Sequence, residues 1–207
     1  MIKKLIYLIA ILFLIVPNAM TFMGPAVGGG GMPPVAGGGT PESLAGSYTT
    51  TANVDTSIDI GRPGLFDYSK QSFVLTGSGD VTVTTIYLWV QQNGTCDTNN
   101  TRLQVYTGTA STPDTQVENA DVSVDPQTFP SSYDWVAFTF GTPITLTLGT
   151  MYVLVVTGDA YIDSGNKAIW GADGSASPYD AGEARYGTSL TSSDQIGGDF
   201  LFDVWGY

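Results

Sequence analysis

Aromatic side chains that lie off the apolar stripes of the predicted strands are the residues of this chain best suited to bind a ligand. Residue alternation places Tyr87, Trp89, Tyr106 and Trp135 on strand faces opposite the predicted core residues. A sugar ring presents an apolar face, and an aromatic ring offers it flat contact area beside a polar group. We therefore expect Trp89 and Tyr106 to contact a carbohydrate or another cell-surface ligand. The alternative for Trp89 and Trp135 is a second packing layer.

A second set of aromatic residues lies in or beside a stretch rich in Gly, Asp and Ser, from residue 159 to residue 187. These residues are Trp170, Tyr179 and Tyr186. Long loops at the ends of a β-sandwich often bind ligands. We expect the three side chains to complete the ligand site, and packing within the domain is the alternative.

Two loops carry side-chain oxygens of the kind that Ca²⁺ prefers. The residues are Asp97, Asn99 and Asn100 in one loop, and Asp159, Asp163 and Asn166 in the other. Neither loop matches the EF-hand or the nonapeptide calcium pattern. Calcium is the one cofactor that the sequence suggests, with Asp97, Asn99, Asp159 and Asp163 as the expected ligands. The alternative is that these are solvated turn residues.

Catalysis is not expected of this chain. It contains no histidine, which excludes Ser-His-Asp and Cys-His hydrolases and His-ligated zinc or haem. Glycoside hydrolysis by two carboxylates stays formally open, because the chain has sixteen Asp and three Glu. Many of the Asp stand in turn sequences, where side-chain to backbone hydrogen bonds explain them. The formal net charge of -12 argues against a nucleic-acid surface.

The first residues of the chain predict export. Two lysines precede a run of twelve apolar residues (5–16), as in a secretory signal peptide. The run is shorter than the roughly twenty residues of a membrane span. With cleavage after Ala26, residues 1–26 are the signal peptide and the protein is secreted. An uncleaved N-terminal anchor is the alternative.

A leader rich in Gly and Pro is expected at residues 27–42. Twelve of the eighteen residues from 24 to 41 are Gly or Pro. Such a stretch buries too little apolar area to offset the entropy lost on ordering it, so it is expected to be flexible. The alternative is an extension that docks on a neighbouring subunit, anchored by Met32, Val35 and Ala36.

The single cysteine, Cys96, cannot form a disulfide within the chain. It is expected to be either a free thiol in a loop or half of a bridge between two chains. No histidine and no adjacent basic residue is available to activate it as a nucleophile.

Period-two alternation recurs from residue 43 to the last residue, between turns of Gly, Pro, Asn and Asp. It predicts one all-β domain over residues 43–207, an antiparallel β-sandwich of jelly-roll type. A phase change at Thr84-Thr85 predicts a β-bulge, and the apolar run 151–156 predicts a central strand covered on both faces. The expected strands are residues 71–75, 81–91, 101–107, 117–124, 133–140, 143–148, 151–156, 167–170 and 200–205.

Several short sequence phrases follow one another in order between Gln71 and Gly206. They include Gln71-Ser72-Phe73, Leu103-Gln104-Val105-Tyr106, Trp135-Val136-Ala137-Phe138, Gly149-Thr150-Met151-Tyr152 and Phe202-Asp203-Val204-Trp205-Gly206. The series resembles the exported β-sandwich modules called choice-of-anchor domains, of the R type. This resemblance implies an extracellular, non-catalytic module and implies no ligand. Similar modules usually precede a C-terminal sorting signal, and wall anchoring is not expected of a sequence that ends at Tyr207.

The sequence as a whole predicts a secreted, non-catalytic binding or adhesion module for carbohydrate or a cell-surface ligand. Aromatic stacking and hydrogen bonds from Asn, Asp and Gln are expected to hold the ligand, in loops ordered by calcium. The alternative is a structural subunit of an extracellular filament or surface coat, whose leader adds a strand to a neighbouring sandwich. Self-association belongs to that alternative. Neither nucleic acid nor a stable membrane span is expected after processing.

Overall fold

The computed structural model of the protein describes residues 42–48, 54–174, 182–192 and 194–207. These residues belong to the compact unit Gly39–Tyr207. The predicted signal peptide, the leader up to residue 41 and Tyr179 lie outside the described residues. Within the described ranges, no helix is long and apolar enough to cross a membrane.

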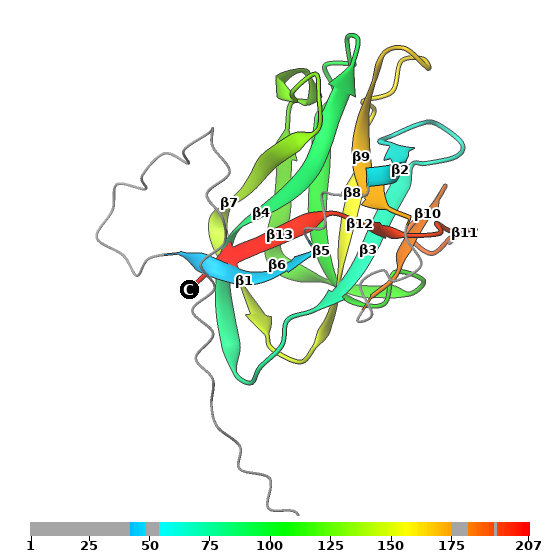
Figure 1. Ribbon diagram of the computed structural model, residues 1–207. Helices are drawn as coiled ribbons and strands as arrows, with labels where there is room; N and C mark the ends of the chain where they lie inside the picture. The colour runs from blue at the N-terminus through cyan, green and yellow to red at the C-terminus, as the bar shows by residue number, and fades with distance from the viewer. Residues whose placement is uncertain (1–41, 49–53, 175–181, 193) are drawn as a thin grey trace, which may run out of the picture. The chain divides into compact units, whose positions relative to one another are not determined.

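The first of two antiparallel sheets has seven strands, in the order β1-β13-β4-β9-β12, with β2 paired to β9 and β7 paired to β4. Figure 1 shows β13 lying between β1 and β4. The strands are β1 (Ser43–Tyr48), β2 (Val54–Asp59), β4 (Asp80–Asn93), β7 (Asp134–Thr147), β9 (Lys167–Asp173), β12 (Asp199–Phe200) and β13 (Phe202–Gly206).

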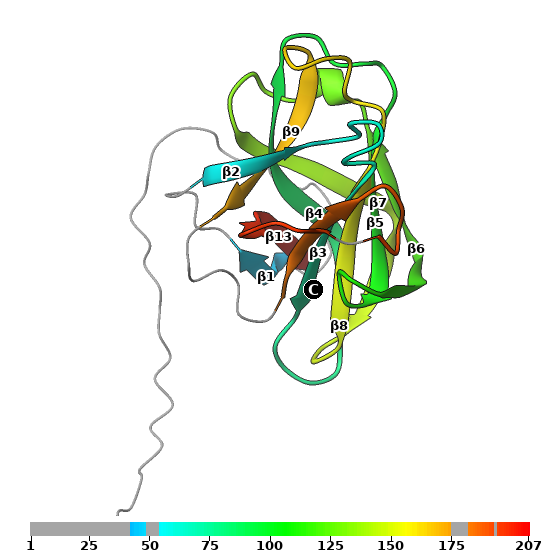
Figure 2. The same ribbon diagram turned by 90° about the vertical axis from the view of Figure 1, so that its right-hand side faces the viewer.

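The second sheet has six antiparallel strands, in the order β11-β10-β3-β8-β5-β6. Its strands are β3 (Tyr68–Val74), β5 (Thr101–Gly108), β6 (Pro113–Val124), β8 (Met151–Thr157), β10 (Ala184–Gly187) and β11 (Asp194–Gln195). In Figure 2, β8, β5 and β6 lie on one side of the molecule, with β1 and β13 on the other. The structure confirms the predicted all-β sandwich.

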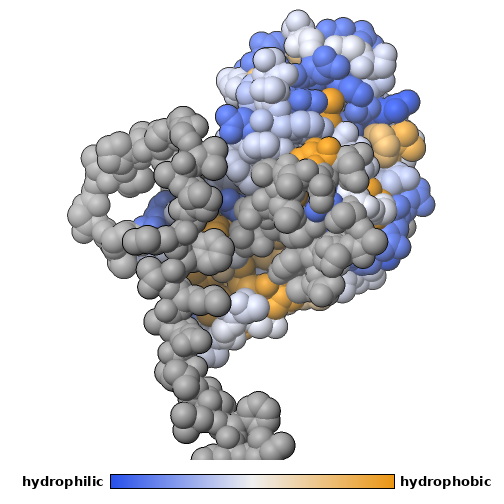
Figure 3. All heavy atoms as spheres, viewed as in Figure 1, coloured by the Kyte–Doolittle hydropathy of each residue, from blue (hydrophilic) through white to orange (hydrophobic). Residues whose placement is uncertain are grey.

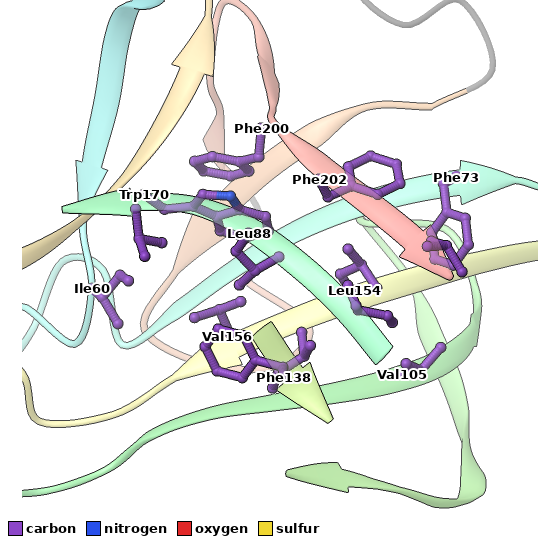
Figure 4. Close-up of a cluster of buried hydrophobic side chains, with 14 of the residues drawn as sticks. Ile60, Phe73, Leu88, Val105, Phe138, Leu154, Val156, Trp170, Phe200 and Phe202 are labelled. Carbon is purple, nitrogen blue, oxygen red and sulfur yellow. The ribbon is translucent and has the colours of Figure 1, made fainter. Parts of the chain in front are cut away.

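One core fills the space between the two sheets. Phe73 of β3 meets Phe202 of β13, with ring centroids 5.4 Å apart, so aromatic contacts join the sheets directly. Trp170 of β9 stacks on Phe200 at a centroid distance of 4.1 Å and an interplanar angle of 12°. Figure 4 shows these rings above a layer of aliphatic side chains that includes Leu154 and Val156. Burial of each large side chain contributes about 2–3 kcal/mol to stability.

Two details of the strand pattern are confirmed. The apolar run 151–156 lies in β8, which is central in the six-stranded sheet and is buried on both faces. The ladder between β4 and β7 shifts register between Val83 and Thr85, where the phase change predicts a bulge.

One pair of predicted strands is corrected. Residues 133–140 and 143–148 form a single strand, β7, rather than two strands separated by a turn. Val83 of β4 pairs with Ile144 of β7, and Thr85 of β4 pairs with Thr139 of β7. The chain between the two paired positions is therefore longer on β7 than on β4. The exposed residues 141–143 therefore form the wide side of the bulge. A bulge tolerates Pro143, because the missing N–H is not needed in the ladder there.

Five short strands were not predicted from the sequence: β1, β2, β10, β11 and β12. Of β12, only Phe200 falls within the predicted range 200–205. Each of the five has six residues or fewer and lacks a run of alternating apolar residues. Their positions depend on partners far along the chain: β1 pairs with β13, and β2 with β9. Local periodicity carries little information about such strands.

Candidate ligand-binding face

Five partly exposed aromatic residues line the outer face of the seven-stranded sheet. The inner-facing Ile86, Leu88 and Val90 of β4 are fully buried, so the residues between them face outward. Opposite residues in an antiparallel ladder project from the same face, and Trp89 stands opposite Trp135. We call the set the aromatic face; it consists of Tyr87 and Trp89 of β4, Tyr133 just before β7, Trp135 of β7 and Trp205 of β13.

The rings of the aromatic face contact one another in two groups. The Trp89 ring lies 5.0 Å from that of Trp135 at an angle of 59°, and 6.5 Å from that of Tyr133 at 9°, nearly parallel. On the neighbouring strand pair, the Tyr87 and Trp205 rings meet edge to face, 6.2 Å apart at 70°. Both arrangements are favoured for aromatic pairs, and together they hold flat apolar surface on a rigid sheet.

A glycine in β9 makes room for the first group. A Cβ atom on Gly171 would lie 2.9 Å from Cδ1 of Trp89 and 3.0 Å from Cε1 of Tyr133. Only a residue without a side chain lets both rings pack this closely over β9. Tyr133 is also tied to β2 by a side-chain hydrogen bond with Ser57, and burial raises the pKa of its phenol.

The second group includes a carboxylate. Asp203 of β13 stands opposite Tyr87 in the β4–β13 ladder, and therefore lies on the same outer face as Trp205, two residues further on. Burial raises the pKa of Asp203 to about 6. Burial also raises the pKa of Tyr87, helped by the negative charges of Glu42 and Asp203.

Three polar atoms of this face have no hydrogen-bond partner in the described part of the chain. They are Nε1 of Trp89, Nε1 of Trp205 and Oδ1 of Asp203, and all three are buried. An unpaired buried polar group costs about 1–3 kcal/mol, so natural folds rarely leave several together without a use. Because these atoms have almost no exposed surface, a ligand reaches the two donors and one acceptor only if the partly exposed rings beside them move.

Within the described ranges, no Lys or Arg side chain forms an ion pair with Asp203, because each of them has partners elsewhere. Asp59 binds both Arg62 and Lys167, Asp121 binds Arg102, and Glu183 binds Arg185. Lys70 donates from Nζ to the carbonyl oxygens of Leu190 and Ser192.

Trp170 is a correction to the sequence analysis. It has 0% of its surface exposed, stacks on Phe200 and donates from Nε1 to the carbonyl oxygen of Leu201 at 2.9 Å. A side chain with no exposed surface offers no face to a ligand, so Trp170 belongs to the core (Figure 4).

The other predicted ligand-binding residues are spread over the molecule. Tyr106 lies on the outer face of the six-stranded sheet, on the opposite side of the sandwich from Trp89, and packs against Val153 and Val155. Tyr186 of β10 packs against the core and meets Phe66 edge to face at 4.8 Å. Of the five predicted residues, only Trp89 lies on the aromatic face; Tyr179 lies outside the described residues.

Sequence reasoning missed three residues of this face and the glycine beneath it. Alternation carries a signal for Asp203 and Trp205, because each lies next to a buried residue of its own strand, and for Tyr133, because it lies two residues before the outward-facing Trp135. No local signal exists for Gly171, since its contacts with Trp89 and Tyr133 depend on long-range packing.

The structure brings the two predicted calcium loops side by side. The backbone N–H of Thr95, close to Asp97, donates to Oδ1 of Asn166 at 3.0 Å. Asp163 accepts hydrogen bonds from the N–H of Gly165 at 2.7 Å and from Nδ2 of Asn166 at 3.0 Å, which lower its pKa.

The carboxylates of these loops are also explained by their own turns. Asp97 accepts from the N–H of Asn99 at 3.4 Å, and Asp159 is exposed. Across the described ranges, no group of three or more His, Cys, Asp or Glu is placed to hold a metal ion.

Cys96 lies in the loop between β4 and β5. The thiol is free, but it lies in the core with 1% of its surface exposed, and burial raises its pKa. The prediction of a free thiol in a loop is therefore confirmed, although the side chain of this loop residue packs into the core. A second chain cannot reach it while the domain is folded, so the bridge between chains is excluded in the folded state.

One pair of carboxylates faces across strands, as a two-carboxylate hydrolase would need. Asp173 of β9 stands opposite Asp199 of β12, and both are buried. Gln71 of β3 donates from Nε2 to Oδ1 of Asp199 at 2.8 Å and accepts from the N–H of Phe200 at 2.8 Å. These contacts tie the two sheets together, which is a structural role.

The sequence matches none of the protein-family models against which it was scanned, and a search of curated proteins also returned no match. The class of this protein is therefore defined by its own fold and face: an antiparallel β-sandwich with an aromatic outer sheet.

Proposed function

We propose that this protein is a non-catalytic module that binds carbohydrate on its aromatic face. The observation that carries the proposal is the contact of Trp89 with Trp135 and Tyr133, three partly exposed rings on one sheet. Stacked and tilted rings on a rigid sheet present apolar contact area already ordered, so little entropy is lost when a sugar ring settles on them. The proposal includes export through residues 1–26 and the kinship with choice-of-anchor modules that the sequence phrases suggest.

The surroundings of the rings support a polar, ring-shaped ligand over a purely apolar one. Unpartnered indole N–H groups of Trp89 and Trp205 stand beside apolar ring surface. Sugars combine apolar faces with hydroxyl groups that accept and donate hydrogen bonds. Among the described residues, the large exposed hydrophobic side chains include Leu44, which stands opposite Trp205, and Tyr207, which follows β13. Figure 3 shows hydrophobic surface among mostly hydrophilic residues in this view.

A glycan-array screen of the purified protein tests the proposal, with the Trp135→Ala variant as its matched control. Trp135 is partly exposed and its loss leaves the core intact, so the variant is expected to fold. Binding of at least one glycan class that falls about tenfold or more in the variant is the expected result. A folded protein that binds no glycan, or binds equally well without Trp135, contradicts the proposal.

A structural subunit is the second candidate, and the position of β1 favours it. β1 follows the Gly/Pro-rich leader directly and pairs only with β13, so among the described strands its other edge has no partner. A strand from a neighbouring molecule can add to such an edge. Analytical ultracentrifugation of the protein with and without residues 27–42 distinguishes the candidates. Large assemblies that disappear on deletion support the subunit, and a monomer in both cases removes it.

A further inference from the structure

We propose that Asp203, Trp205 and Tyr87 form a specificity subsite on the aromatic face, which selects uncharged, hydroxyl-bearing sugars and rejects anionic ones. The inference rests on the proposed carbohydrate-binding function and goes beyond it by assigning the ligand class. It starts from the geometry of the β4–β13 ladder, in which Asp203 stands opposite Tyr87. The Tyr87 and Trp205 rings meet at 6.2 Å, so the three side chains form one group.

The unpartnered atoms of this group define what the ligand must supply. Oδ1 of Asp203 is a buried acceptor without a donor, and Nε1 of Trp205 is a buried donor without an acceptor. A hydroxyl group donates one hydrogen bond and accepts two, so a sugar with neighbouring hydroxyl groups satisfies both atoms once the partly exposed Tyr87 and Trp205 rings shift to uncover them. Nε1 of Trp89, two residues from Tyr87 on β4, offers a further donor on the same face.

The charge of the group excludes acidic sugars. Asp203 and Glu42 are both close enough to Tyr87 to raise its pKa. Every described Lys and Arg side chain is held elsewhere by a carboxylate or by carbonyl oxygens. The carboxylate or sulfate of an anionic sugar would meet negative charge in a half-buried setting, where repulsion is stronger than in water.

Cationic amino sugars fit less well, for a different reason. At the position where it replaces a hydroxyl, an ammonium group would donate to Asp203 but could not accept from the indole N–H of Trp205, whereas a hydroxyl does both. An uncharged hydroxyl satisfies donors and acceptor alike. The geometry therefore points to neutral sugars.

Matched saccharides that differ in charge and in one small substituent test this inference on the purified full chain. The first pair is hexagalacturonic acid and its methyl ester, and the second is the glucosamine hexamer and the N-acetylglucosamine hexamer. Tryptophan fluorescence and calorimetry report binding. In each pair we expect the neutral member to bind at least about tenfold more tightly than the charged member.

The Asp203→Asn variant shows whether Asp203 sets the selectivity. It keeps the shape of the side chain and removes the charge, so we expect weaker binding of the neutral sugar by about tenfold and a smaller penalty for the acid. Asp114→Asn, at an exposed carboxylate of β6, is the charge-matched control and is expected to change neither. A Trp205→Phe variant, which keeps an aromatic ring of smaller size and loses the N–H, is expected to weaken binding of the neutral sugar as well.

The outcomes separate the subsite from the proposed function. If neutral and anionic members bind equally well, or if Asp203→Asn leaves their ratio unchanged, the subsite is wrong while carbohydrate binding stands. Tighter binding of the glucosamine hexamer than of its N-acetylated form overturns the choice of a neutral ligand. If no saccharide of either pair or of the glycan array binds the folded protein, the proposed function fails and the subsite fails with it.

Discussion

The outer faces of the two sheets are built from similar residues but differ in how far other parts of the chain cover them. On the six-stranded sheet, Val153 and Val155 are fully buried beneath Ala110 and Leu190, which belong to the chain's own loops. Lys70 donates from Nζ to carbonyl oxygens of the 188–192 loop and so fastens it over the sheet. On the seven-stranded sheet, the rings of the aromatic face stay partly exposed, and polar atoms of Trp89, Trp205 and Asp203 lack partners among the described residues.

This difference shows how a sandwich separates stability from binding. On the face that the chain covers with its own loops, the buried Lys70 ammonium finds carbonyl partners within the chain, and the apolar side chains add to the packed interior. A face with partly exposed rings and unpaired polar atoms carries a cost that a ligand can offset.

The largest effect is expected from Trp170→Ala, which touches neither outer face. Removing a fully buried indole that stacks on Phe200 should lower the free energy of unfolding by about 3–5 kcal/mol. Chemical denaturation measures this loss. If the variant is instead nearly as stable as the wild type and has lost sugar binding, Trp170 belongs to the ligand site after all.

The covered face should be loosened by Lys70→Met. The variant leaves the carbonyl oxygens of Leu190 and Ser192 without their donor, and we expect a loss of about 2–3 kcal/mol. Amide hydrogen exchange should show faster exchange in residues 188–192 and in β3, with no change on β7. Unchanged protection of the loop would show that Lys70 does not fasten it.

Lys70 also predicts a dependence on pH. Burial, with Arg185 nearby, lowers its pKa from 10.5 to about 8, so the folded state disfavours the charged form. This penalty is fully present below about pH 8 and is relieved as the pH rises toward 10.5. The free energy of unfolding of the wild type, relative to that of Lys70→Met, should therefore increase as the pH rises from about 8 to 10.5.

A smaller loss is expected from Gly171→Ala, on the open side. The added Cβ would lie 2.9 Å from Trp89 and 3.0 Å from Tyr133, so both rings must move. We expect a loss of about 1–2 kcal/mol together with a change in tryptophan fluorescence. Ala137→Gly, on the exposed surface of β7 opposite Tyr87, is the control for a small change on the same face. Fluorescence that matches the wild type would show that the rings do not depend on the space above Gly171.

The smallest effect, and one of opposite sign, is expected from Asp203→Asn. The pKa of Asp203 is raised from 3.8 to about 6, so its ionised form is disfavoured in the folded state. The resulting penalty is absent below about pH 4, grows between pH 4 and 6 and is complete above pH 6. The variant should melt slightly higher than the wild type at pH 7.5 and equally at pH 3.5. A lower melting temperature at pH 7.5 would show that Asp203 has a stabilising partner.

The sequence predicted most of the sandwich because strands such as β4 and β8 carry their pattern locally, in alternation and in continuous apolar runs. It predicted the candidate site only in part. Trp89 and Trp135 follow from alternation, but the burial of Trp170 depends on Phe200, thirty residues away, and on a strand longer than its pattern indicates. Tyr106 obeys the same alternation as Trp89 and is also partly exposed, yet it packs in a cluster with Ala110 and with Leu190 of a distant loop. Alternation tells which side of a strand a residue takes and does not tell what covers that side.

The most direct test of the account compares one aromatic residue from each outer face. The neutral saccharide that binds best on the array is titrated into the wild type, Trp135→Ala and Tyr106→Ala, each first shown to be folded by its thermal melt. We predict that Trp135→Ala weakens binding about tenfold or more, while Tyr106→Ala binds like the wild type. Loss of binding in Tyr106→Ala with binding retained in Trp135→Ala would contradict the assignment of the ligand to the seven-stranded sheet.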